Sequence, residues 1–383
     1  MKIKSNILLM MTASALVLTA CQSDDRQTAT STQGGTSDDT QSAFHEINFQ
    51  VNAADRQSDT RAVTFADLDR LQSDCYVMGS TRNYFSVTAY MDGETDRFIN
   101  SSGNIHVLYS GTGSTPWHFC TKDGTVQTYF WPETIPLNFF AFHPCQMEGG
   151  VPTDKPDPAT CLRLGAYADR TPQLECTALP LTNIGQATLQ ELIYAYTEAI
   201  TYKDYGGYAP LTFQHPLAAV SLTLSSCYPG LTLTGVTFKN IYNNGMGVCS
   251  PTSVSWTTMG PVGSLVLSWN KNDSAEESPT YQKIMGQTMF IGAIDGPFLV
   301  LPQALTDRDA LSDVSMEIKY IKRGEIVEKS IELPMTDTVK EWLSGKHYIY
   351  QLELGKDESI IVGCVVEEWA DHGNTPVGID EDF

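Results

Sequence analysis

The feature that most constrains the fold of this chain is a recurring alternation of apolar and polar residues. Ile47, Phe49 and Val51 alternate with polar neighbours, and the same pattern returns at 85–89 and 105–109. A period of two places alternate side chains on opposite faces of a strand, so these runs predict half-buried β-strands. Turn signals rich in Gly, Asn and Asp separate the runs, which is typical of hairpins. We therefore expect an all-β, mostly antiparallel chain.

Further apolar runs mark the remaining strands that we expect. The run at 137–142 is apolar on both faces, which is typical of a central strand covered on both sides. Residues 187–201 fit both a helical face and a strand, and we expect a short helix or turn followed by a strand. Short strands at this spacing favour sandwiches over a parallel sheet. The other expected strands lie at 217–224, 231–238, 264–269, 298–301, 314–321, 348–354 and 360–366.

The length of the chain calls for more than one domain. It has 383 residues, whereas one β-sandwich holds about 100. We expect two sandwich domains divided near Pro229 and Gly230. Residues 145–180 carry five prolines and three cysteines, which predicts a long surface insertion in the first domain. The expected order is a signal peptide at 1–20, a flexible tether at 21–43, a first domain at 44–229, a second domain at 230–371 and a C-terminal arm at 372–383.

The N-terminus has the pattern of an export signal. Lys2 and Lys4 precede an apolar stretch at 7–17, which is shorter than the roughly 20 residues that span a bilayer. Leu-Thr-Ala before Cys21 resembles the lipobox of bacterial lipoproteins, and an ordinary secretory signal is the alternative. The resemblance implies that Cys21 is acylated, incorporates palmitate and anchors the chain to the outer membrane. The acidic pair that follows resembles the signal for surface exposure in Bacteroidetes lipoproteins.

Charge and motifs exclude several classes of function. Lys and Arg number 24 against 45 Asp and Glu, for a formal net charge of -21. Because a nucleic-acid surface needs positive charge, nucleic acid is excluded as a partner. The sequence also lacks a nucleotide-binding turn, a nucleophile elbow and an HExxH helix. We expect no enzymatic activity and no cofactor.

Two His and Cys pairs raise the question of a metal site. His118 and Cys120, and then His143 and Cys145, are each two residues apart, so each pair shares one face of its expected strand. Such side chains could ligate zinc. The alternative, which we favour, is that they pack beside neighbouring aromatic residues and that the cysteines form disulfides. We accordingly expect no metal.

The cysteine count favours disulfides. Nine cysteines less Cys21 leave eight, an even number, in a chain expected to be exported. Cys227 and Cys249 flank an expected hairpin and are the best candidate pair. A second bond among the three cysteines of 145–180 would pin that segment.

Several stretches form an ordered pattern along nearly the whole chain. They are Thr60-Arg61-Ala62, then 129–132 with 137–142, then 211–218 and 299–303, and finally Trp342 with Gly345, Tyr348 and Tyr350. Together, from the lipobox to Val365 and Trp369, they resemble the fimbrillin family, the lipoprotein pilins and pilus accessory proteins of Bacteroidetes. The resemblance implies two tandem transthyretin-like β-sandwich domains, no enzymatic activity and a place in a pilus (fimbrium) on the cell surface.

The resemblance also implies a mechanism of assembly. A trypsin-like protease removes a leader that holds the first strand, and a neighbouring subunit then fills the vacated groove by strand exchange. Here the leader would be residues 44–61, with the cut between Arg61 and Ala62. Arg56 is a second candidate cut site, and the alternative is that Arg61 lies in an exposed loop without being cleaved. The implied partners are other pilus subunits, the protease and a host or bacterial surface ligand for adhesion.

Two features depart from a plain shaft subunit, and one competing interpretation stays open. The cysteines and the segment 145–180 favour an accessory or tip role, and the acidic C-terminal arm is a weak donor strand. The competing interpretation is a surface glycan-binding lipoprotein of a nutrient-uptake system, which needs exposed aromatic side chains. Those that could stack on sugars are Trp117, Trp256 and Trp269.

Overall fold

Strands form where the alternation predicts them in the computed structural model, so the expected all-β class is confirmed. Among the residues that the structure describes, the single helical element is a 3-10 turn, Pro158–Thr160. In this part of the chain, no helix is long and apolar enough to cross a membrane. The described residues are 45–53, 84–94, 96–99, 105–109, 117–121, 124–148, 151–165, 171–182, 189–227, 231–268, 289–291, 297–306, 313–322, 329–335, 339–355 and 359–369.

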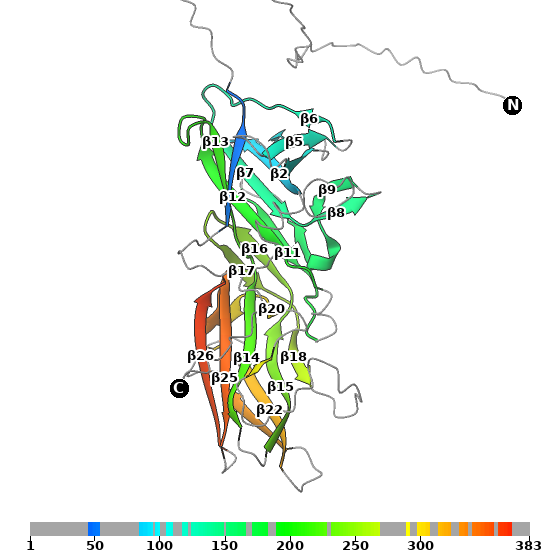
Figure 1. Cartoon of the computed structure of the whole chain (residues 1–383), viewed down its shortest axis with the longest axis vertical. Helices are drawn as coiled ribbons and strands as arrows, with labels where there is room; N and C mark the ends of the chain where they lie inside the picture. Colours follow the sequence, from blue (N-terminus) through cyan, green and yellow to red (C-terminus); the bar gives the residue numbers. More distant parts are fainter. Residues whose placement is uncertain are drawn as a thin grey trace, which may run out of the picture. The chain divides into compact units, whose positions relative to one another are not determined.

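A large antiparallel sheet forms the centre of the first half of the chain (Figure 1). Its strand β7 (Leu137–His143) pairs with β2 (Tyr84–Met91) on one side and β12 (Ile193–Ile200) on the other. Every residue of β7 is buried, which confirms that the run at 137–142 is a central strand. The sheet continues through β4 (Ile105–Tyr109), β5 (Trp117–Thr121) and β6 (Val126–Gln127), and β3 (Arg97–Ile99) pairs with β2.

The segment 187–201 is a strand in its second part, as expected, but its first part is not helical. Residues 193–200 are strand β12, and 189–192, the described residues before them, have no helical structure. Residues 187 and 188 lie outside the described part. Strand pairing with β7 decides the outcome, because Tyr194 and Tyr196 belong to one face of the sheet and Ile193 and Ala195 to the other.

One face of the central sheet is covered by a pair of strands far apart in the sequence. Strand β1 (Asn48–Ala53) pairs in parallel with β13 (Tyr208–Phe213). Their inward side chains share one core with residues of the central sheet such as Phe85 and Phe139. This two-stranded layer therefore closes one side of the first sandwich.

A four-stranded sheet covers the opposite face, and it corrects the expected surface insertion. Leu162 and Leu174 are almost fully buried in one core with Phe140 and Tyr194 of the central sheet. The described strands of this segment at 162–164 and 173–176 therefore cover the core with their alternate residues, rather than forming a surface insertion. In order, this sheet holds β10 (Leu162–Leu164), β11 (Gln173–Cys176), β16 (Gly245–Cys249) and β17 (Val254–Thr258), and a separate hairpin holds β8 (Cys145–Glu148) and β9 (Val151–Pro156).

The second half of the chain forms another sandwich, in which two sheets share one core. Phe238 from one sheet packs on Tyr350 from the other, at a ring distance of 5.3 Å. Trp342 donates from Nε1 to the Tyr350 hydroxyl at 2.9 Å. The first sheet holds β19 (Met289–Ile291), β14 (Ala218–Cys227), β25 (Lys346–Leu354) and β26 (Ile360–Glu368), with β20 (Phe298–Val300) also on β14; the second holds β18 (Val262–Ser268), β15 (Leu231–Tyr242), β22 (Ser315–Lys322) and β23 (Lys329–Pro334); β21 (Gln303–Ala304) pairs with β24 (Glu341–Trp342).

Strand pairing divides the chain differently from the expected boundary at Pro229 and Gly230, two residues outside the described part. Strand β14 precedes that point, yet it pairs with β20 and β25, so the later sheets already begin at Ala218. Strands β16 and β17 then return to β11 of the first half. Local patterning could not predict this return, because alternation gives a strand's faces and not its partner.

Candidate functional site

The first described strand lies with one face in the core. Ile47, Phe49 and Val51 are buried, with exposures of 2%, 3% and 9%, whereas Gln50 between them is exposed. This is the alternation that the sequence predicts for these three residues. Strand β1 therefore holds its place through one apolar face.

Phe49 is the centre of that face. Its ring meets Phe119 at 4.9 Å, Phe85 at 5.9 Å and Phe139 at 6.0 Å, each in an edge-to-face arrangement. Aromatic pairs of this geometry contribute about 0.5–1.5 kcal/mol beyond the burial of their area. All three partners belong to the central sheet, so Phe49 fastens β1 to that sheet.

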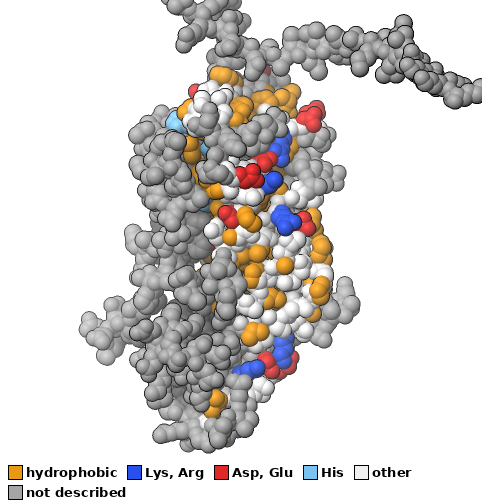
Figure 2. All heavy atoms as spheres, turned by 90° about the vertical axis from the view of Figure 1, so that its right-hand side faces the viewer, with side chains coloured by type: hydrophobic (Ala, Val, Ile, Leu, Met, Phe, Trp, Pro, Cys, Tyr) orange, Lys and Arg blue, Asp and Glu red, His pale blue; other side chains and the backbone are white. Residues whose placement is uncertain are grey.

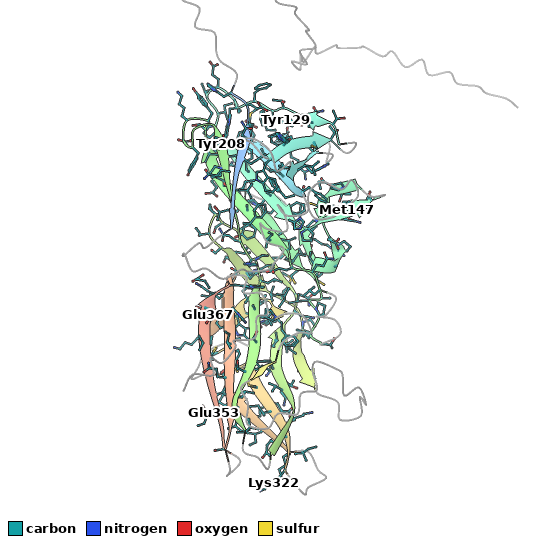
Figure 3. All side chains as sticks on the ribbon, in the orientation of Figure 1. Tyr129, Met147, Tyr208, Lys322, Glu353 and Glu367 are labelled. Atoms are coloured by element: carbon teal, nitrogen blue, oxygen red, sulfur yellow. The ribbon has the colours of Figure 1, made fainter. Side chains whose placement is uncertain are left out.

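Among the strands that the structure describes, β1 pairs with β13 alone. It runs in register with β13 from Asn48 opposite Tyr208 to Ala53 opposite Phe213. Beyond this ladder, the described contacts of its backbone are at its start, where the Ile47 amide donates to the Tyr129 carbonyl at 2.8 Å. Figure 3 labels Tyr129 and Tyr208, which lie beside the start of β1. Strand β1 is thus an inserted strand beside β13.

Residues before and beside β1 make further contacts around the strand. The imidazole of His45 stacks on Tyr202, with ring centroids 3.9 Å apart. The Trp131 amide donates to the His45 carbonyl at 2.8 Å, and Trp131 Nε1 donates to the Gly207 carbonyl at 3.1 Å. Apart from Ile47 and β1, the buried residues of this core come from residues 85–213. We call the residues that pack around β1, considered without β1 itself, the β1 groove.

The processing and lipidation sites expected from the sequence, Cys21, Arg56, Arg61 and Ala62, lie outside the described residues. Described structure stops at Ala53, the last residue of β1, and resumes at Tyr84, the first residue of β2. These expectations stay predictions.

The two His and Cys pairs lie within the protein rather than at a common site. His143 is buried, its Nδ1 donates to the Tyr84 carbonyl at 2.8 Å, and desolvation lowers its pKa to about 4. Cys120 and Cys145 are buried free thiols, and burial raises the pKa of Cys120 to about 11. Across the part of the chain that the structure describes, no group of three or more His, Cys, Asp or Glu side chains is placed to hold a metal ion.

Six cysteines of the described residues are free thiols in the structure, and the disulfides expected from the cysteine count stay predictions. Cys249 is a buried free thiol next to the core of the first half, whereas Cys227 ends β14 at the far end of a ten-residue strand. A disulfide between Cys227 and Cys249 stays a prediction. The three cysteines of the segment 145–180 are also free thiols. The strand that follows Cys227 and the strand that bears Cys249 belong to different sheets, so the two cysteines do not flank one hairpin.

The aromatic residues proposed for sugar binding do not form an exposed platform in the described residues. Trp117 is buried in the core with an exposure of 4%. Trp256 is partly buried and donates from Nε1 to the Pro216 carbonyl at 2.7 Å. Trp269 lies outside the described residues. On the face drawn in Figure 2, hydrophobic, acidic and basic side chains are interspersed.

Sequence reasoning missed a buried cluster between the two halves of the chain. Glu191 is buried and hydrogen-bonds through Oε1 to His215 Nδ1, while its Oε2 is buried without a hydrogen-bond partner. Burial raises the pKa of Glu191, and the neighbouring His215 partly offsets this. Sequence periodicity does not predict such a cluster, because Glu191 and His215 lie in separate loops between strands.

Comparisons with known proteins agree with the fold. The chain matches the family model described as fimbrillin-like over residues 80–369. A comparison with curated proteins gives no match. A fimbrial protein from Bacteroides vulgatus ATCC 8482 is 14% identical with a TM-score of 0.52, over 85% of this chain and 100% of that one.

Two candidate cell adhesion proteins are also similar, each 14% identical with a TM-score of 0.44. The one from Bacteroides uniformis ATCC 8492 covers 86% of this chain and 99% of its own, and the one from Bacteroides ovatus ATCC 8483 covers 85% and 97%. The resemblance seen in the sequence is confirmed by the family match, which extends over well more than half of the chain. This protein therefore belongs to the fimbrillin-like family.

Proposed function

We propose that this chain is a fimbrial subunit that is exported as a lipoprotein through Cys21 and activated for assembly by cleavage after Arg61. In this proposal, residues 44–61 are a leader whose strand β1 occupies the β1 groove until a protease removes it. A strand from another subunit then takes its place. The observation that carries the proposal is the packing of three side chains, Ile47 just before β1 and Phe49 and Val51 within it, in a core that later residues build.

Membership of the fimbrillin-like family supports a structural, non-enzymatic role at the cell surface. One similar protein of known structure, from Bacteroides vulgatus, is a fimbrial protein, which supports the same role. Other pilus subunits are therefore the natural partners.

The energetics favour an exchange of strands over an empty groove. Burial of each of Ile47, Phe49 and Val51 contributes about 1.5–3 kcal/mol. Each hydrogen bond in the ladder with β13 adds about 1 kcal/mol. Loss of the leader removes these stabilising contributions. It also exposes the unpaired edge of β13 and the apolar side chains around it. An incoming strand of the same alternation would restore both, which is the physical basis of strand addition.

Limited trypsin digestion of the full chain, extracted in detergent, tests the proposal. We expect a new terminus at Ala62, release of the lipid-bearing leader and concentration-dependent oligomers in size-exclusion chromatography. Arg61→Ala should stay monomeric, and Arg56→Ala together with Arg61→Ala excludes cleavage at the second site.

A peptide added in trans makes the test specific for the β1 groove. A synthetic peptide of residues 44–55 should suppress oligomers of the cleaved protein, and the same peptide with Phe49→Asp should not. If the cleaved protein stays monomeric with its leader still bound, the leader is a permanent part of the fold and the proposal fails.

A further inference from the structure

Cys161 and Cys176 lie on neighbouring positions of one hairpin. Strand β10 pairs with β11 so that Leu162 is opposite Cys176, and Cys161 immediately precedes Leu162. The Thr177 amide donates to the Cys161 carbonyl at 3.2 Å, so the pairing continues one step beyond the strands. The two cysteines thus sit on adjacent rungs of the same ladder, at the open end of the hairpin.

Cys161 departs from regular strand geometry, and this departure matters for a disulfide. On adjacent rungs of a regular ladder the two side chains would point to opposite faces. Cys161 has a left-handed backbone with φ of 56°, because it closes the 3-10 turn before β10.

Both side chains also face the same core. Cys176 belongs to the buried cluster under the four-stranded sheet, and Cys161 is partly buried against that cluster. Their thiols are close enough to influence each other electrostatically. The other described thiols in this core, Cys145 and Cys249, lie on β8 and β16 rather than on this hairpin.

We propose that Cys161 and Cys176 are a redox pair that forms a disulfide once the protein reaches an oxidising compartment. The oxidant is a small-molecule disulfide such as oxidised glutathione. A thiolate of one cysteine attacks it and releases one glutathione thiolate; the second cysteine then attacks the mixed disulfide and releases the other. Two protein thiols lose two protons and two electrons, and the oxidant becomes two thiols. The inference does not depend on cleavage at Arg61.

Exposure assigns the order of these steps. Cys161 is partly exposed and forms the mixed disulfide, whereas Cys176 is 1% exposed and resolves it. Burial raises the pKa of Cys161 and raises that of Cys176 to about 12. Because the thiolate is the nucleophile, the bond should form faster as the pH rises. The bond would link the start of β10 to the end of β11, in the hairpin that covers Phe140 and Tyr194.

Peptide mapping of the full chain tests this assignment. The protein is incubated with oxidised glutathione, alkylated, and digested with trypsin and a glutamyl endopeptidase without reduction. Glu148 separates Cys145 from Cys161, and Arg163 with Arg170 separates Cys161 from Cys176. We expect one linked pair of peptides, holding Cys161 and Cys176, that disappears on reduction.

Single variants give the matched controls. Cys161→Ser and Cys176→Ser should each abolish the linked pair, and Cys176→Ser should stop at a glutathione adduct on Cys161. Cys364→Ser, on β26 of the second sandwich, should leave the link intact. A link from Cys161 to any other cysteine, or a glutathione adduct that persists on Cys161 in the wild-type chain, would overturn the proposal.

Discussion

The imidazole of His215 stacks on the indole of Trp369, with ring centroids 4.3 Å apart and an angle of 12° between the planes. His215 lies between β13 and β14, where the chain passes from one set of sheets to the other, and Trp369 directly follows β26. The Trp369 amide donates to the Gly345 carbonyl, and the Gly345 amide donates to the Leu217 carbonyl. The end of the last described strand is therefore fixed to the connection between the two halves.

Removal of the Trp369 ring should destabilise the protein markedly. Trp369 is 5% exposed, and truncation of a buried Trp to Ala costs about 3–5 kcal/mol. Trp369→Phe should cost less, because a ring still stacks on His215. Urea unfolding measures the difference. Leu343→Ala is the control, since Leu343 is 45% exposed; equal losses for Trp369→Ala and Leu343→Ala would contradict the role given to the stack.

The buried carboxyl beside this stack should make stability depend on pH. Burial raises the pKa of Glu191 above its usual range. A group whose pKa is raised by folding stabilises the protein fully below its unfolded value, and that stabilisation is lost as the pH rises through the folded value. Glu191→Gln should therefore gain stability relative to wild type as the pH rises from 4 to 7. Unfolding curves across this range measure the gain, and a constant difference would show that Glu191 does not titrate there.

Two buried histidines should make stability depend on pH in the opposite direction. Desolvation lowers the pKa of His106 and of His143 to about 4 each, against about 6.5 in the unfolded chain. The unfolded state then binds more protons between these values, so stability falls as the pH drops from 6.5 towards 4. Each histidine contributes about 3 kcal/mol to this loss.

Titration by NMR of the histidine ring protons checks this directly in the folded protein. His106 and His143 should both stay neutral at pH 5.5. His143→Gln should reduce the slope of stability against pH by about one proton, and His118→Gln serves as the control on β5. A folded-state pKa near 6.5 for His143 would contradict the prediction.

Strands and faces were predictable from the sequence, whereas partners were not. The run at 137–142 identified β7 as central because residues on both faces must meet other layers. The alternation of Phe49 likewise gave its inward face. The parallel pairing of β1 with β13 left no local trace, because the hydrogen bonds of a ladder involve backbone atoms of every residue type.

The segment 145–180 shows that amino-acid composition can hide a short alternating pattern of apolar residues. Its prolines indicated a surface loop, yet β11 alternates with Leu174 and Cys176 inward. Four residues are too few for periodicity to stand out. Burial was decided by β16, which pairs with β11 from a distant part of the chain.

A glycine in β16 should be intolerant of substitution. A Cβ at Gly247 would lie 2.6 Å from Val254 Cγ1 and 3.1 Å from the ring of Trp256. Gly247→Ala should therefore destabilise by about 1–3 kcal/mol through overpacking. Gly363→Ala on β26 is the control, because its Cβ would meet nothing closer than 3.8 Å. Thermal unfolding compares the two, and a tolerated Gly247→Ala would contradict the close approach of β17.

Phe49 should decide how firmly β1 is held in the β1 groove. Phe49→Ala removes the ring that meets Phe85, Phe119 and Phe139, and such a change costs about 3–5 kcal/mol. Phe49→Leu keeps most of the buried area and should cost less, whereas Gln50→Ala changes only an exposed side chain. In the full chain, the rate at which trypsin releases the leader should rise in the order Gln50→Ala, Phe49→Leu, Phe49→Ala, because a loosely held strand leaves its groove more often. Equal rates for Gln50→Ala and Phe49→Ala, in proteins with intact global stability, would mean that the seat of Phe49 does not control departure of the strand.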